Sequence, residues 1–340
     1  MKEMLSIERR LVAAWYNNSA WLWPLAPFSW LFGRLAQVRR VWLQNRFQGH
    51  RYSAPVVVVG NISVGGSGKT PLVIALVKAL AEHGLKAGVV SRGYGGQATE
   101  YPLLVGSDTC VEDSGDEPLL IAHMTAQLGC PVVVDPDRSR GVNYLLATHR
   151  LDVVLTDDGL QHYRLHRDIE IAVVDASRGL GNRRLLPTGP LREPIQRLHE
   201  VDFVIVNGDA AEIEADAQIQ LLPQRFRNLA SGREVAPARW DQGNAVNAVA
   251  AIGNPQRFAA TLKSLGLDVK LHAKDDHRPL RLTDLLFDDN KAVIITAKDA
   301  VKLVSSVADN VWVLDVEIVL PSQFVEQLLQ RLHSFKQLET

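Results

Sequence analysis

Lys69 and Thr70 close a glycine-rich run whose residue types suit a phosphate chain. The run, Gly65-Gly66-Ser67-Gly68-Lys69-Thr70, follows an uninterrupted series of valines at 56–59. Glycines let backbone N–H groups turn toward one anion, and a helix N-terminus adds partial positive charge. The lysine can reach the β- and γ-phosphates, and the threonine hydroxyl can ligate Mg²⁺. The strict motif has glycine at position 63, where this chain has serine, and the double glycine offers the missing freedom.

Two adjacent carboxylates, Asp157 and Asp158, follow an apolar strand candidate at residues 153–155. An acid at the end of a strand beside a phosphate loop commonly organises Mg²⁺. Because neighbouring residues at a strand end point in opposite directions, one carboxylate should face the metal and the other a structural partner. An acidic turn after a strand is the alternative.

A second acidic pair, Asp116 and Glu117, precedes an apolar helical stretch. The spacing of Ser114 and Glu117 is that of a capping box, so these residues could serve only to begin the helix. In the functional interpretation, Asp116 is a general base that accepts a proton from an attacking hydroxyl, and Glu117 belongs to the metal shell.

Basic and polar loops could bind anionic groups. Arg178, Arg183, Arg184 and Arg192 alternate with glycines and prolines, so their guanidinium groups can clamp phosphate oxygens. Loops containing Tyr94 and Arg138 follow predicted strands, where ligand contacts fall. His277, in Asp275-Asp276-His277, is an isolated loop histidine, which in most proteins is ordinary surface.

These groups need a parallel sheet to bring them together. Apolar strands alternate with helical stretches, which predicts an α/β fold: a P-loop NTPase-like, mostly parallel sheet with helices on both faces. A nucleotide then lies at the carboxyl ends of the strands. The predicted strands are 56–59, 87–90, 132–134, 153–155, 169–174 and 203–206, and the predicted helices are 71–82, 117–128 and 139–149.

The pattern loosens after residue 206 and then resumes. A second group of strands is predicted at 248–252, 270–272, 293–296 and 311–316, with helices at 255–264 and 323–334. We therefore expect residues 47–206 to form a P-loop core and residues 207–340 a smaller C-terminal α/β domain that closes over the nucleotide cleft.

Residues 1–46 differ in composition from the rest. Residues 1–51 hold eight Lys or Arg against two acids, and five of the seven tryptophans. The apolar stretch between Ala20 and Gly33 is shorter than the ~20 residues of a spanning helix. We expect an amphipathic helical segment that lies on an anionic membrane surface. A helical hairpin packed on the protein's own core is the alternative.

The net charge and the cysteine content of the chain bear on its partners and its cellular setting. Its net charge of −1 argues against nucleic acid as the main partner. Cys110 and Cys130 lack metal-ligand spacing, which favours a reducing cytosolic setting.

Taken together, the motifs resemble the tetraacyldisaccharide 4'-kinase family, the lipid A 4'-kinases of Gram-negative bacteria. The resemblance rests on the order of the motifs along most of the chain. The motifs are Gly60-Asn61, residues 65–71, Ser91-Arg92-Gly93-Tyr94-Gly95, Gly115-Asp116-Glu117-Pro118, residues 157–162, residues 186–193, Asp276-His277 and Lys298-Asp299-Ala300-Val301-Lys302.

The resemblance implies transfer of the ATP γ-phosphoryl group, with Mg²⁺, to the 4'-hydroxyl of tetraacyldisaccharide 1-phosphate. The product is lipid IVA, made by a peripheral protein, expected to be a monomer, at the cytoplasmic face of the inner membrane. The implied residue roles fall into four groups. Catalysis belongs to Asp116, His277 and Lys69, nucleotide binding to residues 65–70 with Asp158 and Gln161, metal binding to Thr70, Asp157 and Glu117, and substrate binding to Tyr94, Arg138 and Arg192.

Two other functions remain open from the residues. A membrane-associated P-loop ATPase or GTPase switch has a similar phosphate loop, although residues 296–299 lack the Asn-Lys-x-Asp spacing for guanine. A non-catalytic, nucleotide-sensing adaptor at the membrane is the third function. Phosphate transfer to a lipid disaccharide distinguishes the kinase from both.

Overall fold

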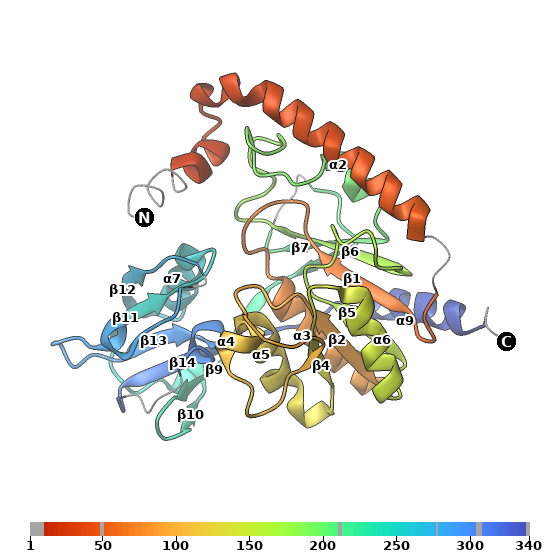
Figure 1. Cartoon of the computed structure of the whole chain (residues 1–340). Coiled ribbons are helices and arrows are strands. Elements are labelled where there is room, and N and C mark those ends of the chain that lie inside the picture. Colours follow the sequence, from red (N-terminus) through yellow and green to blue (C-terminus); the bar gives the residue numbers. More distant parts are fainter. Residues whose placement is uncertain (1–9, 48–50, 210–212, 277, 304–307, 338–340) are drawn as a thin grey trace.

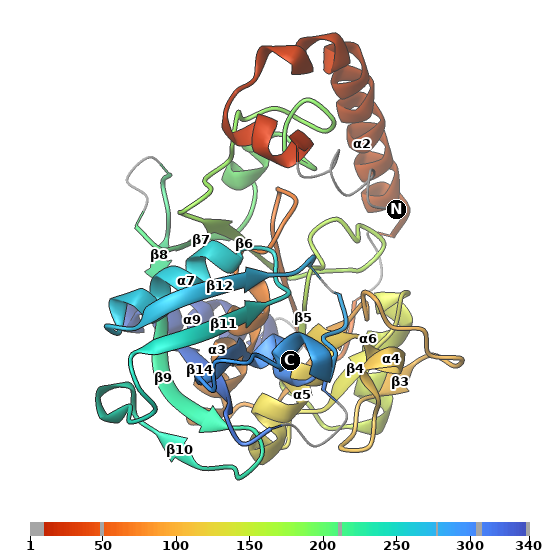
Figure 2. The same cartoon turned by 90° about the vertical axis from the view of Figure 1, so that its left-hand side faces the viewer.

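The computed structural model describes residues 10–47, 51–209, 213–276, 278–303 and 308–337. These residues form an N-terminal helical unit, an eight-stranded sheet and a six-stranded sheet (Figure 1). The two sheets belong to two lobes that lie side by side in Figure 1, and in Figure 2, where the second lobe faces the viewer, the N-terminal unit lies above the lobes.

The first sheet has its phosphate-loop strand near the middle. Its order is β3-β4-β2-β5-β1-β6-β7-β8, and every pair is parallel except β3 with β4. The strands are β1 (Val56–Gly60), β2 (Ala87–Ser91), β3 (Leu103–Leu104), β4 (Val132–Val134), β5 (Val153–Thr156), β6 (Ile169–Asp175), β7 (Phe203–Asn207) and β8 (Ala217–Ile219).

The valine run of β1 is buried on both faces of this sheet. Val57 and Val59 pack into a core shared with α3 (Lys69–Glu82), α5 (Asp116–Thr125) and α9 (Ser322–Gln337). Val56 and Val58 face the opposite core, which contains α6 (Arg138–Thr148). Side chains alternate across a strand, so a strand covered on both sides needs an uninterrupted apolar sequence.

The second lobe has its own mixed sheet, in the order β10-β9-β14-β13-β11-β12. Strands β11 to β14 pair in parallel, whereas β9 runs antiparallel to both β14 and β10. Helix α7 (Pro255–Ser264) packs through Phe258 and Leu262 on one face. The strands are β9 (Leu221–Asn228), β10 (Glu234–Val235), β11 (Ala245–Ala250), β12 (Asp268–Ala273), β13 (Val293–Thr296) and β14 (Val311–Ile318).

The predicted fold class is confirmed, and each strand predicted from the sequence overlaps an observed one. The short strands β3, β8 and β10 and the long strand β9 were not predicted. Two elements beyond residue 206 belong with the first sheet: β8 pairs with β7, and α9 packs on the first core through Phe324, Leu328 and Leu332. The apolar stripe of α9 shows one helical face but does not reveal which sheet that face covers.

The N-terminal unit consists of helical residues 10–16, a 3₁₀ turn at Ala20–Leu25 and α2 (Ala26–Phe47). Ala14, Trp15 and Leu22 are buried together, with Val64 and Leu186 of the first lobe packed against them. Among the described residues, we find no helix with the length and apolar character needed to cross a bilayer.

Candidate active site

The phosphate loop joins the carboxyl end of β1 to α3. Gly68 precedes α3 with φ +90°, and a Cβ there would lie 2.3 Å from the side-chain nitrogen of Asn207. Asn207, at the end of β7, donates a hydrogen bond to the backbone oxygen of Ser67 at 3.2 Å. Both the left-handed conformation and the close approach require glycine at position 68.

Lys69, the first residue of α3, faces Asp158. Its Nζ lies 3.4 Å from Asp158 Oδ1. Burial raises the pKa of Asp158, but the cations of Lys69, Arg192 and Arg138 outweigh burial and lower it to about 2. Asp158 is therefore an anion that orients the ammonium of Lys69.

Asp157 lies in a different environment, beside Thr70. The Thr70 hydroxyl donates to Asp157 Oδ2 at 3.2 Å, while the buried Oδ1 has no hydrogen-bond partner. Burial, followed by the charge of Glu117, raises the pKa of Asp157 to about 7. An orphaned carboxylate oxygen beside a threonine hydroxyl fits the oxygen ligands of Mg²⁺.

Few protein ligands are available for that ion. The described part of the chain holds no group of three or more His, Cys, Asp or Glu side chains arranged to bind a metal. Mg²⁺ commonly takes one or two protein carboxylates and completes its shell with phosphate and water.

The second acidic pair meets lysines from the second lobe. Lys298 in α8 (Ala297–Ala300) lies 2.9 Å from Glu117 and 3.7 Å from Asp116. Lys302 lies 3.5 Å from Asp116. Burial would lower the pKa of Lys298, but Glu117 and Asp116 reverse the effect and raise it.

The capping-box alternative is not what this segment forms. Gly115 is the N-cap of α5, and no side chain caps the helix. The Ser114 hydroxyl instead donates to the backbone oxygens of Cys110 and Gly115. Glu117 contacts Lys298 rather than a capping serine.

Arg192 and Gln161 approach the same acidic cluster. Arg192 Nη1 lies 3.5 Å from Asp158 Oδ2 and 3.5 Å from Gln161 Oε1. Gln161 also donates to the backbone oxygen of Asn61, the residue after β1. Lys69, Asp158, Arg192 and Gln161 thus form one connected group beside the phosphate loop.

The other predicted site residues have varied positions. Arg138 is 4% exposed, and its Nη2 donates to the backbone oxygen of Asp158 at 2.7 Å, so it fixes the acidic turn. Burial lowers its pKa to about 10. Tyr94 is an exposed loop residue. His277 lies outside the described residues, and its role stays a prediction.

A family model described as "LpxK: Tetraacyldisaccharide-1-P 4'-kinase" matches residues 21–333, and so includes the phosphate loop, both acidic pairs and α8. The chain belongs to this family. A tetraacyldisaccharide 4'-kinase of Pseudomonas fluorescens is 44% identical over 322 residues, 94% of this chain and 95% of that protein. The Hahella chejuensis kinase is 44% identical over 328 residues, 95% of this chain and 96% of its own length.

A solved structure extends the family comparison to the fold. LpxK from Aquifex aeolicus, described as an "apo" form in complex with ATP, matches with a TM-score of 0.75 at 27% identity. The match covers 92% of this chain and 99% of that one, so the fold is shared over most of both chains. The family resemblance stated from the motifs is therefore confirmed.

The candidate site of this chain also contains contacts between the two lobes that were not predicted from the sequence. Arg257 of α7 lies 3.3 Å from Asp175 and donates to Asn207 at 2.6 Å. The backbone of Gly253 lies so close to the phosphate loop that a Cβ on it would be 2.9 Å from the nitrogen of Gly66. The only sequence signal for these contacts is the position of Asp175 and Asn207 at predicted strand ends.

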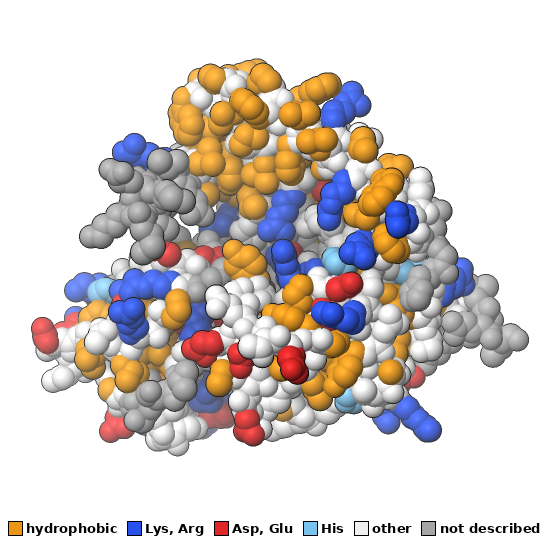
Figure 3. All heavy atoms as spheres, in the orientation of Figure 1, with side chains coloured by type: hydrophobic (Ala, Val, Ile, Leu, Met, Phe, Trp, Pro, Cys, Tyr) orange, Lys and Arg blue, Asp and Glu red, His pale blue; other side chains and the backbone are white. Residues whose placement is uncertain are grey.

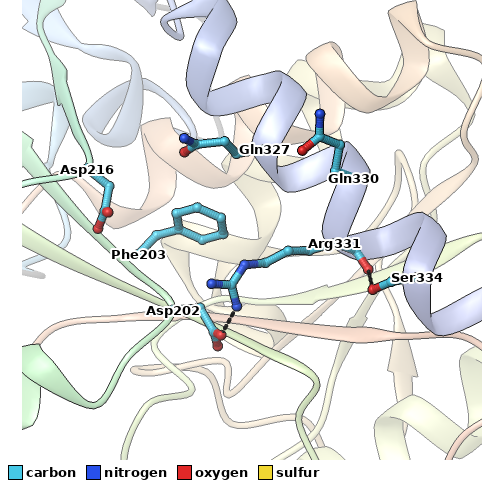
Figure 4. A pocket seen from close by; sticks show the side chains of 7 residues that line it. All are labelled: Asp202, Phe203, Asp216, Gln327, Gln330, Arg331 and Ser334. Atoms are coloured by element: carbon cyan, nitrogen blue, oxygen red, sulfur yellow. Dashed lines mark hydrogen bonds and ion pairs between the residues drawn. The ribbon is translucent and has the colours of Figure 1, made fainter.

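A hollow of about 460 Å³ lies elsewhere, between α9 and the amino ends of β7 and β8 (Figure 4). Arg331 crosses it to pair with Asp202, and its guanidinium lies 5.0 Å from the ring centre of Phe203. Because the phosphate loop lies at the carboxyl ends of the strands, this hollow is separate from the site. We interpret these contacts as ones that fasten α9 to the sheet.

Proposed function

We propose that the chain transfers the γ-phosphoryl group of ATP to the 4'-hydroxyl of tetraacyldisaccharide 1-phosphate, giving lipid IVA. As a member of its family, the protein is a kinase of lipid A biosynthesis. The observation that carries the mechanism is that Asp157, bonded to Thr70, interacts with the charges of Lys69 and of Glu117, the residue next to Asp116. The Aquifex aeolicus relative, described in complex with ATP, supports ATP as the donor.

In this mechanism, Asp116 accepts the proton of the 4'-hydroxyl. The sugar oxygen forms a bond to the γ-phosphorus as the bond to the β–γ bridging oxygen breaks, and ADP leaves. The amides of residues 65–68 and the ammonium of Lys69 hold the phosphates and stabilise the charge that shifts to the leaving group. His277 is proposed to assist Asp116, as the motif resemblance implies.

Thr70 and Asp157 are the residues proposed to hold Mg²⁺. When bound, Mg²⁺ would neutralise phosphate charge and orient the γ-phosphoryl group. The orphaned Oδ1 of Asp157 supports this assignment. Glu117 is proposed to contribute to the same metal site through its second carboxylate oxygen, since Oε1 pairs with Lys298. Asp157 and Glu117 would each offer one carboxylate oxygen to the ion or to a water molecule bound to it.

Arg192 is proposed to neutralise phosphate charge as the transfer proceeds. Its guanidinium already lies beside Asp158, in the group that contains Lys69. Tyr94 is exposed, and we propose that it contacts the acceptor sugar. Arg138 is the weakest of the proposed substrate ligands, since its Nη2 donates to backbone oxygens of the acidic turn.

We propose that the N-terminal unit binds the cytoplasmic face of the inner membrane. Figure 3 shows apolar side chains gathered over this unit, with Lys and Arg side chains bordering them. The exposed side chains at this surface are Trp21, Trp23, Phe28, Trp30, Leu31, Leu35, Val38, Val41 and Trp42. Each methylene buried in lipid contributes about 0.8 kcal/mol, and the flanking arginines favour anionic headgroups. An acylated substrate requires the enzyme to work at such a surface.

The membrane proposal predicts a loss of vesicle binding when this surface is made polar. We expect Trp30→Gln with Trp42→Gln to lower co-sedimentation with anionic vesicles several-fold. The control is Leu286→Gln with Val319→Gln, because these side chains are equally exposed but belong to the second lobe. Equal loss in both variants, or no loss in the first, would contradict the proposal.

Lipid phosphorylation distinguishes the kinase from the switch and the adaptor. Purified protein with γ-labelled ATP and the detergent-dispersed disaccharide should yield a labelled glycolipid. A switch would release labelled phosphate instead, and an adaptor would bind ATP without consuming it.

A further inference from the structure

We propose that Ser29 and Thr188 are positioning residues for Arg192, so that the N-terminal unit helps to assemble the active site. The proposal rests on the role proposed above for Arg192. It goes beyond that role because it gives the N-terminal unit a part in turnover besides membrane binding. The connecting element is the segment 185–192, here called the bridging loop.

The bridging loop is held on one side by the N-terminal unit. The hydroxyls of Ser29 and Thr188 lie 2.6 Å apart, and the backbone N–H of Thr188 donates to Ser29 Oγ at 3.0 Å. Ser29 Oγ also donates to the oxygen of Leu185, and Trp15 Nε1 donates to the oxygen of Pro187 at 2.9 Å. Ser29 and Thr188 are 8% and 1% exposed, so water cannot readily replace these bonds.

The bridging loop also packs against the N-terminal unit through its apolar side chains. A Cβ on Gly33 would lie 2.6 Å from Leu185 Cδ1, so the side chain of Leu185 lies against α2 at this glycine. Leu186 packs against the buried Trp15 and Leu22. The loop is thus seated by packing as well as by hydrogen bonds.

The opposite side of the loop contacts the chain that leads into the phosphate loop. Val64 N–H donates to the oxygen of Pro190 at 2.9 Å, and Arg192 N–H donates to the oxygen of Ile62 at 2.7 Å. Between them, Ser63 and Leu191 form an antiparallel bridge. The backbone position of Arg192 is therefore set from both sides.

The side chain of Arg192 depends on that backbone position. It reaches Asp158 and Gln161 at 3.5 Å each, distances at which a small shift of the loop breaks both contacts. Asp158 in turn orients Lys69. A displacement of about 1 Å at a charge-stabilising group can lower the rate by about 10²-fold.

The residue after Ser29 in α2 points to the solvent. Trp30 is 64% exposed on the proposed membrane surface, whereas Ser29 points into the protein. Adjacent residues of α2 therefore serve two separable purposes, and substitutions at Ser29 or Thr188 should affect turnover without affecting membrane binding.

Kinetics of matched variants test the proposal. Thr188→Val keeps the side-chain shape but removes the hydroxyl, Thr188→Ser keeps the hydroxyl, and Ser29→Ala removes the partner. Gln37→Ala, an exposed position on the same helix, is the control. With detergent-dispersed acceptor, we expect Thr188→Val and Ser29→Ala to lower kcat about 10- to 100-fold, with KM for ATP and vesicle co-sedimentation changed less than about twofold. Thr188→Ser should retain most of the activity.

A double-variant cycle shows whether these residues act through Arg192. In an Arg192→Met background, Ser29→Ala should cause little further loss, because the group that it positions is already gone. A loss in that background equal to the loss in the wild-type background would overturn the proposal, as would normal kcat in Thr188→Val.

Amide hydrogen exchange tests the proposal without relying on activity. Thr188→Val should speed exchange at residues 185–192 and 62–64 and leave exchange in β11 and β13 unchanged. Unchanged exchange in the bridging loop would overturn the inference. Failure of the wild-type protein to phosphorylate the disaccharide would instead refute the proposed function, so the two failures are distinguishable.

Discussion

Replacing Asp116 with asparagine removes the proposed base and keeps the size of the side chain. The side chain is 5% exposed at the start of α5, and its carboxylate lies 3.5 Å from Lys302 and 3.7 Å from Lys298. Asparagine fills the same space but cannot accept a proton. Lys302 keeps Asp299 at 2.9 Å and the oxygen of Ala251 at 3.1 Å, and Lys298 keeps Glu117. We therefore expect the free energy of unfolding to decrease by only about 1–3 kcal/mol.

The effect on turnover should be much larger. A positioned general base contributes about 10²- to 10⁴-fold, so kcat of Asp116→Asn should fall by that factor, or about 3–5 kcal/mol in activation free energy. ATP affinity, measured by calorimetry, should change less than about threefold, since the phosphates are held by the phosphate loop and Lys69. Asp113→Asn, an exposed acid in α4 (Val111–Ser114), is the control. Near-normal kcat in Asp116→Asn, or a loss of ATP binding in parallel with kcat, would refute the reasoning.

Two further predictions concern the phosphate side of the site. Lys69→Met removes the ammonium beside Asp158, so ATP affinity should weaken and kcat should fall about 10²- to 10³-fold; normal binding and turnover would remove Lys69 from the mechanism. Burial and Glu117 raise the pKa of Asp157 to about 7, so this carboxyl gains a proton as the pH falls through 7. Because only the carboxylate ligates Mg²⁺, the affinity for Mg²⁺–nucleotide should fall as the pH falls below 7, and Asp157→Asn should reduce this dependence. A flat affinity profile between pH 5 and 7 would contradict the assignment.

The central strands could be predicted because a strand that is buried on both faces needs a continuous apolar sequence. The valines of β1 form an uninterrupted run, as burial on both faces requires, and the glycine loop and α3 follow in the expected order. The edge strands could not be predicted in the same way. β8 has only Ala217–Ile219, and in β9 the positions around Pro223 alternate between partly exposed and exposed, so pairing partners rather than local pattern define both strands.

The site shows the same division. Residues within one motif, such as Lys69 and Thr70, were assigned from spacing alone. Contacts across motifs were not. Lys298 and Lys302 belong to a recognised motif, but charged residues on a short helix and in the turn after it resemble a solvated surface, and only the fold shows them beside Asp116. Arg138 was assigned to the substrate from the family resemblance, and its place after a predicted strand agreed with a ligand contact. Its near-complete burial, with hydrogen bonds to backbone oxygens, depends on tertiary packing.

The central claim is that this chain phosphorylates an acylated disaccharide from ATP held at Lys69. The most direct measurement incubates the purified full chain with γ-labelled ATP, Mg²⁺ and detergent-dispersed tetraacyldisaccharide 1-phosphate, and follows the label into the glycolipid. The account predicts a labelled bisphosphorylated lipid with the wild-type chain and at most about one hundredth of that rate with Asp116→Asn. Label that appears only as free phosphate, or equal lipid labelling by the two proteins, would contradict it.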